Sequence, residues 1–281
     1  MDLVTNFGNP CSPIFYDTPR DLLYYPKEKK LISEGIMSML ILVKIGGSVI
    51  TDKNVYRRFR EDSCKKIIQT LSILNEDLIM THGAGSFGHI IAKKSGFPKR
   101  FKQEDVHAFS IVHKDVLDLN TRIAGIMLEE GLSPISIPTQ SIYRNGSPDL
   151  TDFKKYLSLG FTPLGMGDVI LRAGMIKIIS ADDLLVALSA VFKPNLVIFM
   201  TDVDGIYDND PKTVSDAKLL KSIDRNIAFS QVMNDVTGGM KSKYEKILKI
   251  RKHAGKVVVV NGNKPERLND IGKKDFIGTV I

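Results

Sequence analysis

One segment of eleven residues carries residue types that suggest chemistry. The stretch MTHGAGSFGHI, residues 80–90, holds three glycines, two histidines and a serine where an apolar run ends. Glycine lets backbone N–H groups approach an anion closely, and a helix that follows adds its positive N-terminal end. His82 and His89 lie on either side of the glycines. The segment therefore predicts an anion-binding turn with an imidazole beside it.

Similar glycine turns recur where other apolar runs end. Each of KIGGS, GMGD and TDVDG follows such a run, and TGGMKSK precedes a helical pattern. In an open parallel sheet, ligands bind beyond the carboxyl ends of the strands. One glycine turn is weak evidence, but several at one sheet edge predict a surface lined with backbone amides.

Several lysines are placed where an anion would stabilise them. Lys44 lies within an apolar run and Lys53 follows nine residues later. A lysine in a central strand is costly unless its ammonium reaches a counter-charge or water. Lys241 and Lys243 fall in the first turn of a predicted helix, where cations oppose the helix dipole. A nearby anionic ligand would relieve both problems.

Two adjacent carboxylates begin another predicted helix. Asp182 and Asp183 precede the apolar pattern LLVALSAVF. Acidic residues at this position often serve as helix caps. Asp182 could instead tether the lysines, and the pattern alone leaves both alternatives open.

Strand-like and helical patterns alternate along the chain, which favours a mostly parallel sheet with helices on both faces. Strands are expected at 40–45, 77–82, 132–138, 161–171, 195–201 and 256–260, and near the end of the chain at 276–281. Helices are expected at 61–74, 104–130, 181–192 and 238–254, the last closed by Gly255. Residues 171–180 are expected to form a hairpin around Ala173 and Gly174.

The glycine pattern does not match the commonest nucleotide motifs. No G-x-x-x-x-G-K-[ST] sequence occurs. The letters GAGSFG at 83–88 fit G-x-G-x-x-G, but they follow the second predicted strand, and no acidic residue ends a strand about twenty residues later. A dinucleotide fold is therefore disfavoured.

Composition sets broader limits. The chain has 281 residues, a net charge of +7, 25% charged and 43% apolar residues, and two cysteines. The lysines are scattered and no basic tract is interleaved with aromatic residues, so we expect no nucleic-acid partner. No apolar run reaches the roughly 18–20 residues that span a bilayer, and no signal peptide is evident. A cytoplasmic protein without a membrane partner is expected. Residues 1–38 lack the periodic pattern of the rest of the chain and are interpreted as an N-terminal extension whose role the sequence does not indicate.

The motifs KIGGSVITDK, THGAGSFGH, GDVIL followed by ISADD, FMTDVDGIYDNDPK and DVTGGMKSKYE occur in an order that resembles the amino acid kinase superfamily. Within it, they closely resemble the isopentenyl phosphate kinases of the archaeal type. The likeness runs from about residue 39 to 281 and implies an α/β fold, a three-layer αβα sandwich with an open, mainly parallel sheet. It also implies an acceptor-binding half at about 39–175 and an ATP-binding half at about 176–281.

The resemblance also implies roles for individual residues. The catalytic set it implies is His89, Lys44, Lys53, Asp182 and Lys243. The implied ATP-binding residues are Lys44, Gly46, Gly47, Ser48, Gly85, Asp202, Gly205, Tyr207, Gly239 and Lys243. The implied acceptor-binding residues are Ala84, Gly85, His89 and Gly167, with an apolar wall of Phe109, Val112, Val169 and Ile178. No residue is assigned as a metal ligand.

The implied activity is transfer of a phosphoryl group from ATP, with Mg²⁺, to isopentenyl phosphate, in a protein expected to form a homodimer. A phosphate acceptor needs no general base, because its oxygen is already ionised. Rival hypotheses are a kinase of the same superfamily that acts on a phosphonate such as fosfomycin, on a carboxylate or on uridylate, and a nucleotide-binding sensor without turnover. The sensor hypothesis predicts loss of the lysines or of Asp182, and all of them are present. His82 is expected to support the turn, and His107, His113 and His253 to be exposed or on helix faces.

Overall fold

The computed structural model describes residues 38–144, 147–223 and 238–281, with the side chains of 238–242 left out. The expectation for residues 1–38 therefore falls almost entirely outside the described residues. The expected division into an acceptor half and an ATP half stays a prediction.

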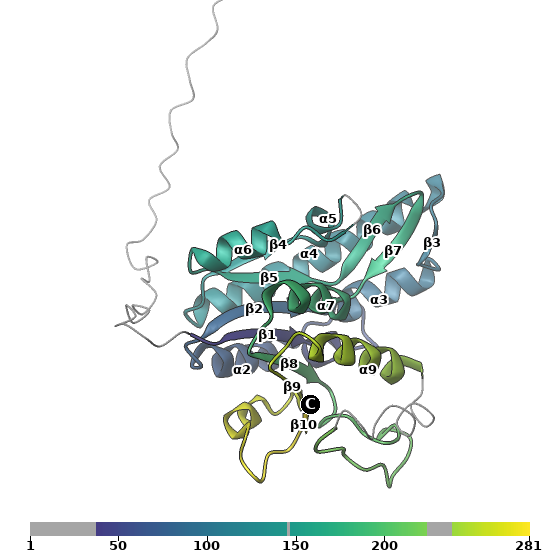
Figure 1. Ribbon diagram of the computed structural model, residues 1–281. Coiled ribbons are helices and arrows are strands. Elements are labelled where there is room, and N and C mark those ends of the chain that lie inside the picture. The colour runs from purple at the N-terminus through teal and green to yellow at the C-terminus, as the bar shows by residue number, and fades with distance from the viewer. Residues whose placement is uncertain (1–37, 145–146, 224–237) are drawn as a thin grey trace, which may run out of the picture.

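A seven-stranded sheet runs through the centre of the molecule (Figure 1). Its order is β10-β9-β8-β1-β2-β5-β4, and every neighbouring pair is parallel except β10 with β9. The strands are β1 (Leu40–Ile45), β2 (Asp77–His82), β4 (Pro134–Ile137), β5 (Thr162–Met166), β8 (Leu196–Thr201), β9 (Lys256–Asn261) and β10 (Thr279–Val280). The parallel strands bring their carboxyl ends to one edge, where the glycine turns lie.

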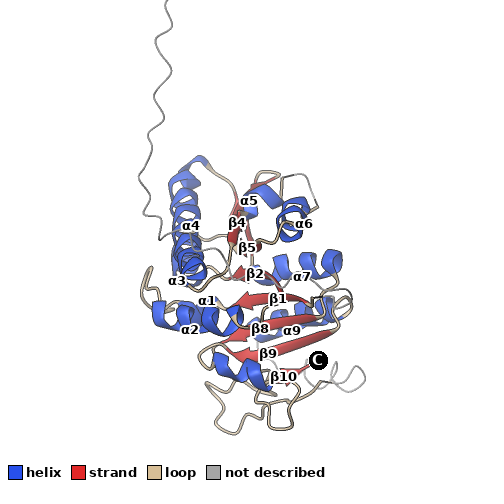
Figure 2. Cartoon of the chain, turned by 90° about the vertical axis from the view of Figure 1, so that its left-hand side faces the viewer, coloured by secondary structure: helices blue, strands red, loops and turns tan. Residues whose placement is uncertain are grey.

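Helices cover both faces of this sheet, as Figure 2 shows. One apolar core joins the sheet to α1 (Gly47–Ile50), α2 (Glu61–Ser72), α3 (Gly85–Lys94) and α4 (Val106–Glu129). A second core joins the opposite face to α5 (Thr139–Ile142), α6 (Thr151–Ser158), α7 (Ala181–Phe192) and α9 (Gly238–Arg251). Strands buried on both faces need continuous apolar runs, which explains the composition of β1 and β8. The predicted αβα sandwich is confirmed.

A smaller sheet lies beside the large one. It has the order β3-β7-β6, from β3 (Lys99–Arg100), β6 (Asp168–Arg172) and β7 (Met175–Ile179). Ala173 and Gly174 join β6 to β7 with φ of 50° and 70°, the positive values that a tight two-residue hairpin turn requires. The predicted hairpin is confirmed. The run 161–171 is divided at Gly167, because β5 ends in the large sheet and β6 begins the small one.

The helix bounds differ from expectation in detail. A 3₁₀ turn, η2 (Gln103–Asp105), precedes α4, and α9 ends at Arg251 rather than next to Gly255. Another 3₁₀ helix, η3 (Pro265–Asp270), packs near the end of the chain, and the sequence patterns did not reveal α6. Over the described part of the chain, no helix combines the length and apolarity needed to cross a membrane.

The turns after β1 and β2 touch each other through their backbones. A side chain at Gly47 would lie 2.4 Å from the nitrogen of Gly85, and Gly85 itself has a φ of +51°. The buried hydroxyl of Thr51 bridges the two turns, since it donates to the carbonyl of Gly47 at 2.7 Å and accepts from the N–H of Ser86 at 3.0 Å. Two turns that are far apart in the sequence are thereby held in contact.

We expect Thr51→Val to lower stability and turnover together. Valine keeps the shape but leaves the N–H of Ser86 without its partner, which costs about 1–3 kcal/mol. Thr121→Val is the matched control, because this exposed hydroxyl of α4 only bonds the carbonyl of Leu117. Denaturant unfolding compares the two variants. Equal stability of the two would show that the bridge does not hold the turns.

Candidate active site

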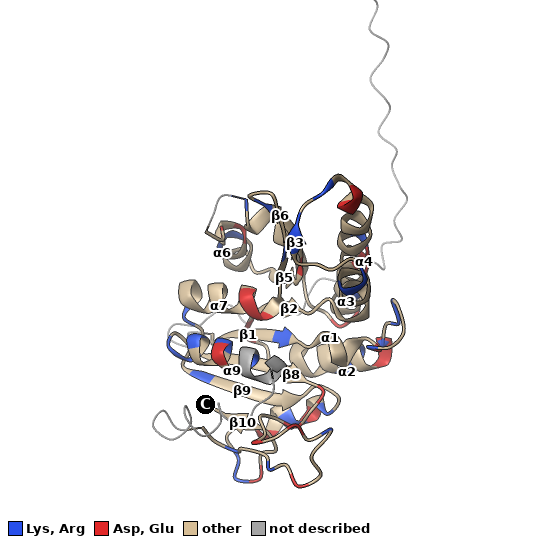
Figure 3. Cartoon of the chain, turned by 90° about the vertical axis from the view of Figure 1, so that its right-hand side faces the viewer, with Lys and Arg blue, Asp and Glu red and all other residues tan. Residues whose placement is uncertain are grey.

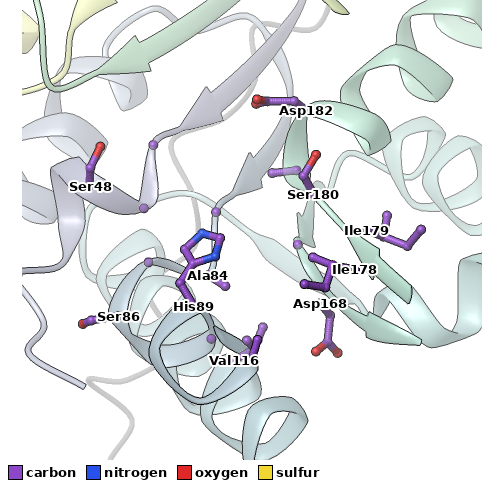
Figure 4. Close-up of a pocket in the computed structure, with 18 of the residues that line it drawn as sticks. Ser48, Ala84, Ser86, His89, Val116, Asp168, Ile178, Ile179, Ser180 and Asp182 are labelled. Carbon is purple, nitrogen blue, oxygen red and sulfur yellow. The ribbon is translucent and has the colours of Figure 1, made fainter. Parts of the chain in front are cut away.

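A cavity of about 440 Å³ opens at the carboxyl edge of the large sheet. Its walls come from the turns after β1 and β2, from α3 and α4, from β6 and β7, and from the start of α7 (Figure 4). It brings together most of the predicted site residues: Lys44, Gly46, Gly47, Ser48, Lys53, Ala84, Gly85, His89, Val112, Gly167, Val169, Ile178, Asp182 and Lys243.

Two short groups of backbone amides face this space. Among the described residues, no hydrogen bond engages the N–H groups of Gly47 and Ser48, or those of Ala84 and Gly85. The first pair begins the short α1, and the second begins the ten-residue α3, so the second pair also lies at the positive end of a helix. These amides can hold two anionic groups side by side.

Two glycines expected to supply such amides already donate them to neighbouring strands. Gly46 donates its N–H to the carbonyl of Met200 at 2.9 Å, and Gly167 donates to the carbonyl of His82 at 3.0 Å. Both bonds continue the sheet ladder past the ends of the strands. The N–H groups of Gly46 and Gly167 are therefore already engaged in this structure, and the ligand contacts expected of them stay a prediction. The two glycines contribute space, because a side chain at Gly167 would meet the nitrogen of Ala181 at 2.9 Å.

Lys44 and Asp182 form the central ion pair of the cavity. The Nζ of Lys44 lies 3.1 Å from Oδ1 of Asp182, and the two side chains are only 10% and 15% exposed. Burial acts to raise the pKa of Asp182, but Lys44 and Lys243 outweigh it and hold that pKa below its ordinary value. Asp182 therefore stays ionised as the counter-charge of the lysines.

Two further lysines complete the positive lining. Burial lowers the pKa of Lys243 to about 8, with a further lowering from Lys44. Lys53 lies 2.9 Å from Asp202, which also pairs with Lys212. Figure 3 shows basic positions on β1 and α9 on the same side of the molecule as the acidic first turn of α7. Cationic groups outnumber ionised carboxylates in the cavity, which suits a polyanion.

Asp183 has a different role from its neighbour. It forms a capping box with Ser180, whose hydroxyl accepts from the N–H of Asp183 at 3.1 Å. Lys246, which the sequence reading missed, lies 2.8 Å from Asp183 and 2.9 Å from the Ser180 hydroxyl. Its position one helical turn after Lys243 is the signal that could have revealed it. Of the two alternatives left open, capping applies to Asp183 and tethering to Asp182.

His89 extends from α3 into the cavity, between Ser48 on one side and Ser180 and Asp182 on the other (Figure 4). Its ring is open to the solvent of the cavity. The surrounding walls desolvate it in part, and with the charges of Lys44 and Lys53 this lowers the pKa of His89. The imidazole is neutral near pH 7 until an anion binds beside it and favours its protonated form.

The other histidines separate into structural and exposed groups. His82 is buried, with its ring nitrogens 3.2 Å from the carbonyl oxygen of Gly83 and 3.1 Å from the amide of Asn120, and burial lowers its pKa to about 4. This agrees with its expected support of the turn. His107 and His253 are exposed. His113 lies on a helix as expected, but it is half-buried and its Nδ1 lies 2.6 Å from the buried Asp168.

The end of the cavity away from the lysines is apolar. It is formed by Ala92, Val112, Val116, Val169 and Ile178. The carboxylate of Asp168 points away from His89 in Figure 4, toward its partner on α4. Phe109 does not line the cavity, although it packs half-buried against the cluster that contains Val112. Its predicted direct contact with an acceptor therefore has no support here.

Of the other predicted nucleotide residues, Asp202, Gly205 and Tyr207 do not line the cavity. Asp202, Gly205 and Tyr207 are in the segment after β8, and Gly239 is in the first turn of α9. A side chain at Gly205 would meet the hydroxyl of Thr279 at 2.5 Å, so this glycine serves close packing. The resemblance assigns Asp202, Gly205 and Tyr207 to the base and ribose of ATP, and Gly239 to ATP binding, and these assignments stay predictions.

Comparison with known proteins identifies the family. The sequence profile of the Amino acid kinase family matches residues 39–261. The chain belongs to this family.

Its relatives narrow the likeness further. The chain is 42% identical over 244 residues to the isopentenyl phosphate kinase of Thermoplasma acidophilum, a match that covers 86% of this chain and 100% of the relative. It is 31% identical to the isopentenyl phosphate kinase of Methanothermobacter thermautotrophicus, over 80% of this chain and 92% of that one. The crystal structure of the T. acidophilum enzyme in its product complex aligns with a TM-score of 0.79 and 40% identity, over 87% and 100% of the two chains. The predicted resemblance to isopentenyl phosphate kinases is confirmed.

We predict that nucleotide affinity falls as the pH rises through about 8. Lys243 has a lowered pKa in the free protein, so it is charged below that pH and neutral above it, and only the charged form attracts phosphate. Titration calorimetry with ATP from pH 7 to pH 9.5 measures the trend. The variant Lys243→Arg keeps its charge and should flatten the profile. An unchanged ATP affinity in the wild type over this range would contradict the assignment.

Proposed function

We propose that this protein transfers the γ-phosphoryl group of ATP to isopentenyl phosphate and forms isopentenyl diphosphate. One observation carries the proposal: a single cavity has a cationic, amide-lined end and an apolar end. Isopentenyl phosphate has the same two parts, a phosphate and a branched five-carbon alkenyl chain. The identity with isopentenyl phosphate kinases supports the same substrate pair.

The geometry suggests how the reaction proceeds. An oxygen of the acceptor phosphate forms a bond to the γ-phosphorus of ATP. The bond from that phosphorus to the oxygen that bridges the β- and γ-phosphates breaks, and ADP leaves. The amides of Ala84 and Gly85 would hold the acceptor, and those of Gly47 and Ser48 would hold the ATP phosphates. Because the two turns are in backbone contact, both reactants are held within reach of each other. Lys44, Lys53 and Lys243 would then stabilise the charge on the transferring group.

Mg²⁺, the homodimer and a cytoplasmic location belong to the proposal. Within the described ranges, no three His, Cys, Asp or Glu side chains lie close enough to hold a metal. We therefore propose that Mg²⁺ arrives on the phosphates of ATP, which it prefers to all-protein sites.

The rival acceptors differ in what they need at the far end of the cavity. Acetylglutamate and uridylate would place polar groups against Val112, Val116 and Val169, without hydrogen-bonding partners from those side chains. A coupled assay of ADP release with isopentenyl phosphate, fosfomycin, acetylglutamate and UMP tests the proposal. We expect isopentenyl phosphate to have the highest kcat/KM, and preference for any other acceptor would overturn the proposal.

We predict that His89→Ala loses turnover while ATP binding is retained. The imidazole lies beside the acceptor amides, where it can donate a hydrogen bond or a positive charge to the acceptor phosphate. Groups of this kind contribute about 10²-fold or more to rate. Steady-state kinetics and ATP calorimetry separate the two effects, with exposed His107→Ala as the control. Wild-type turnover in the His89 variant would remove it from the mechanism.

We also predict that Val112→Ala lets the enzyme accept longer prenyl monophosphates. The phosphate end is fixed by amides, so an added isoprene unit must extend into the apolar wall, and each buried CH₂ contributes roughly 0.8 kcal/mol. Phe109→Ala should act only indirectly, because Phe109 packs behind that wall. The test is kcat/KM for isopentenyl, geranyl and farnesyl phosphates. Equal changes for all three acceptors would show that Val112 is ordinary core.

A further inference from the structure

Lys53 is carried by an exposed segment that needs an anchor. Residues 51–60 connect α1 to α2, and the Lys53 side chain is 57% exposed although it lines the cavity. At the base of the segment, a bridge between Thr51 and Phe59 and the bond from the N–H of Arg60 to the carbonyl of Ile50 close the loop. These contacts fix the two ends of the loop, but they do not fix the orientation of its middle part relative to the helices.

Arg57 anchors the far part of this loop. Its guanidinium pairs with Asp118, and its Nε lies 3.3 Å from Oδ1 of Asp115. The carboxylate of Asp115 is only 2% exposed, and it also accepts a hydrogen bond from the hydroxyl of Tyr56. A buried carboxylate is costly unless it is paired, so these contacts hold the loop firmly on α4.

The backbone at Arg57 indicates that the side chain decides the conformation. Its φ is +56°, a left-handed value that residues other than glycine, asparagine and aspartate rarely adopt. If only the backbone of the turn mattered, glycine would be expected at this position. The ion pairs of the guanidinium offset the backbone cost.

The surfaces that Arg57 contacts are those that hold the acceptor. Asp115 lies on α4 between Val112 and Val116, which both line the cavity. The guanidinium also lies over the ring of Phe87 on α3, 5.7 Å from its centroid, two residues before His89. One side chain thus connects the loop of Lys53 to both helices of the acceptor wall.

We propose that Arg57 is a positioning residue that sets the place of Lys53 relative to the acceptor through Asp115 and Asp118. This inference deepens the proposed function and rests on it for the acceptor used in kinetics. Arg57 does not line the cavity. It acts by fixing the loop that carries Lys53, so that the ammonium, which also pairs with Asp202, is held where it can meet the transferring phosphoryl group.

The test is a double-mutant cycle. Arg57→Ala should lower kcat about 10- to 100-fold in a protein that circular dichroism still reports as folded at the assay temperature, and Arg57→Lys should recover only part of it, since lysine lacks the planar fork. In a Lys53→Ala background, Arg57→Ala should have no further effect on kcat. The control is Arg122→Ala, which removes another partner of Asp118 without touching the loop. Equal losses in both backgrounds, or an effect no larger than the control, would overturn the proposal.

A second readout does not need the acceptor. Hydrogen exchange of the amides of Asp52 and Arg58, which bond within the loop, should speed up in Arg57→Ala and not in Arg122→Ala. If the wild type fails to phosphorylate isopentenyl phosphate, the proposed function is wrong. The exchange data, together with ATP affinity across the same cycle, still test whether Arg57 fixes the loop. Unchanged exchange in Arg57→Ala overturns the positioning role.

Discussion

The carboxylate of Asp182 pairs with the buried Lys44 and also faces the charge of Lys243, and the organisation of the site depends on it. Lys44 lies in a central strand, where an unpaired ammonium would be prohibitively costly. Asp182 reaches it from the first turn of α7, where the helix dipole also favours a negative charge. Because one carboxylate faces more than one cation, the cavity retains a positive excess. Such an excess favours the binding of an anion such as phosphate, as the proposed function requires.

The contact between the two glycine turns supplies the second requirement, which is distance. Gly47 and Gly85 approach so closely that neither position has room for a side chain. The amides that begin α1 and α3 are therefore adjacent, and two phosphates can be bound next to each other. Without neutralisation they would repel, so the lysines and the turns depend on one another.

Much of this was predictable from sequence, and the failures have physical causes. Apolar periodicity and glycine placement predicted the sheet, the hairpin at Ala173 and the shared edge. The sequence could not show that the N–H groups of Gly46 and Gly167 donate hydrogen bonds to neighbouring strands, because those bonds depend on strand register. It also missed the pairing of His113 with Asp168, which are distant in sequence and brought together only by tertiary packing. The contacts of Arg57 likewise depend on partners on α4 that lie about sixty residues away in the sequence.

The most direct test of the central role of Asp182 is the variant Asp182→Asn. The amide keeps the size of the side chain but removes the counter-charge that orients Lys44 and Lys243. Single-turnover transfer from ATP to isopentenyl phosphate should slow by about 10²-fold or more, in a protein whose circular dichroism still reports a folded αβα domain. A variant that folds and transfers the phosphoryl group at the wild-type rate would contradict the account.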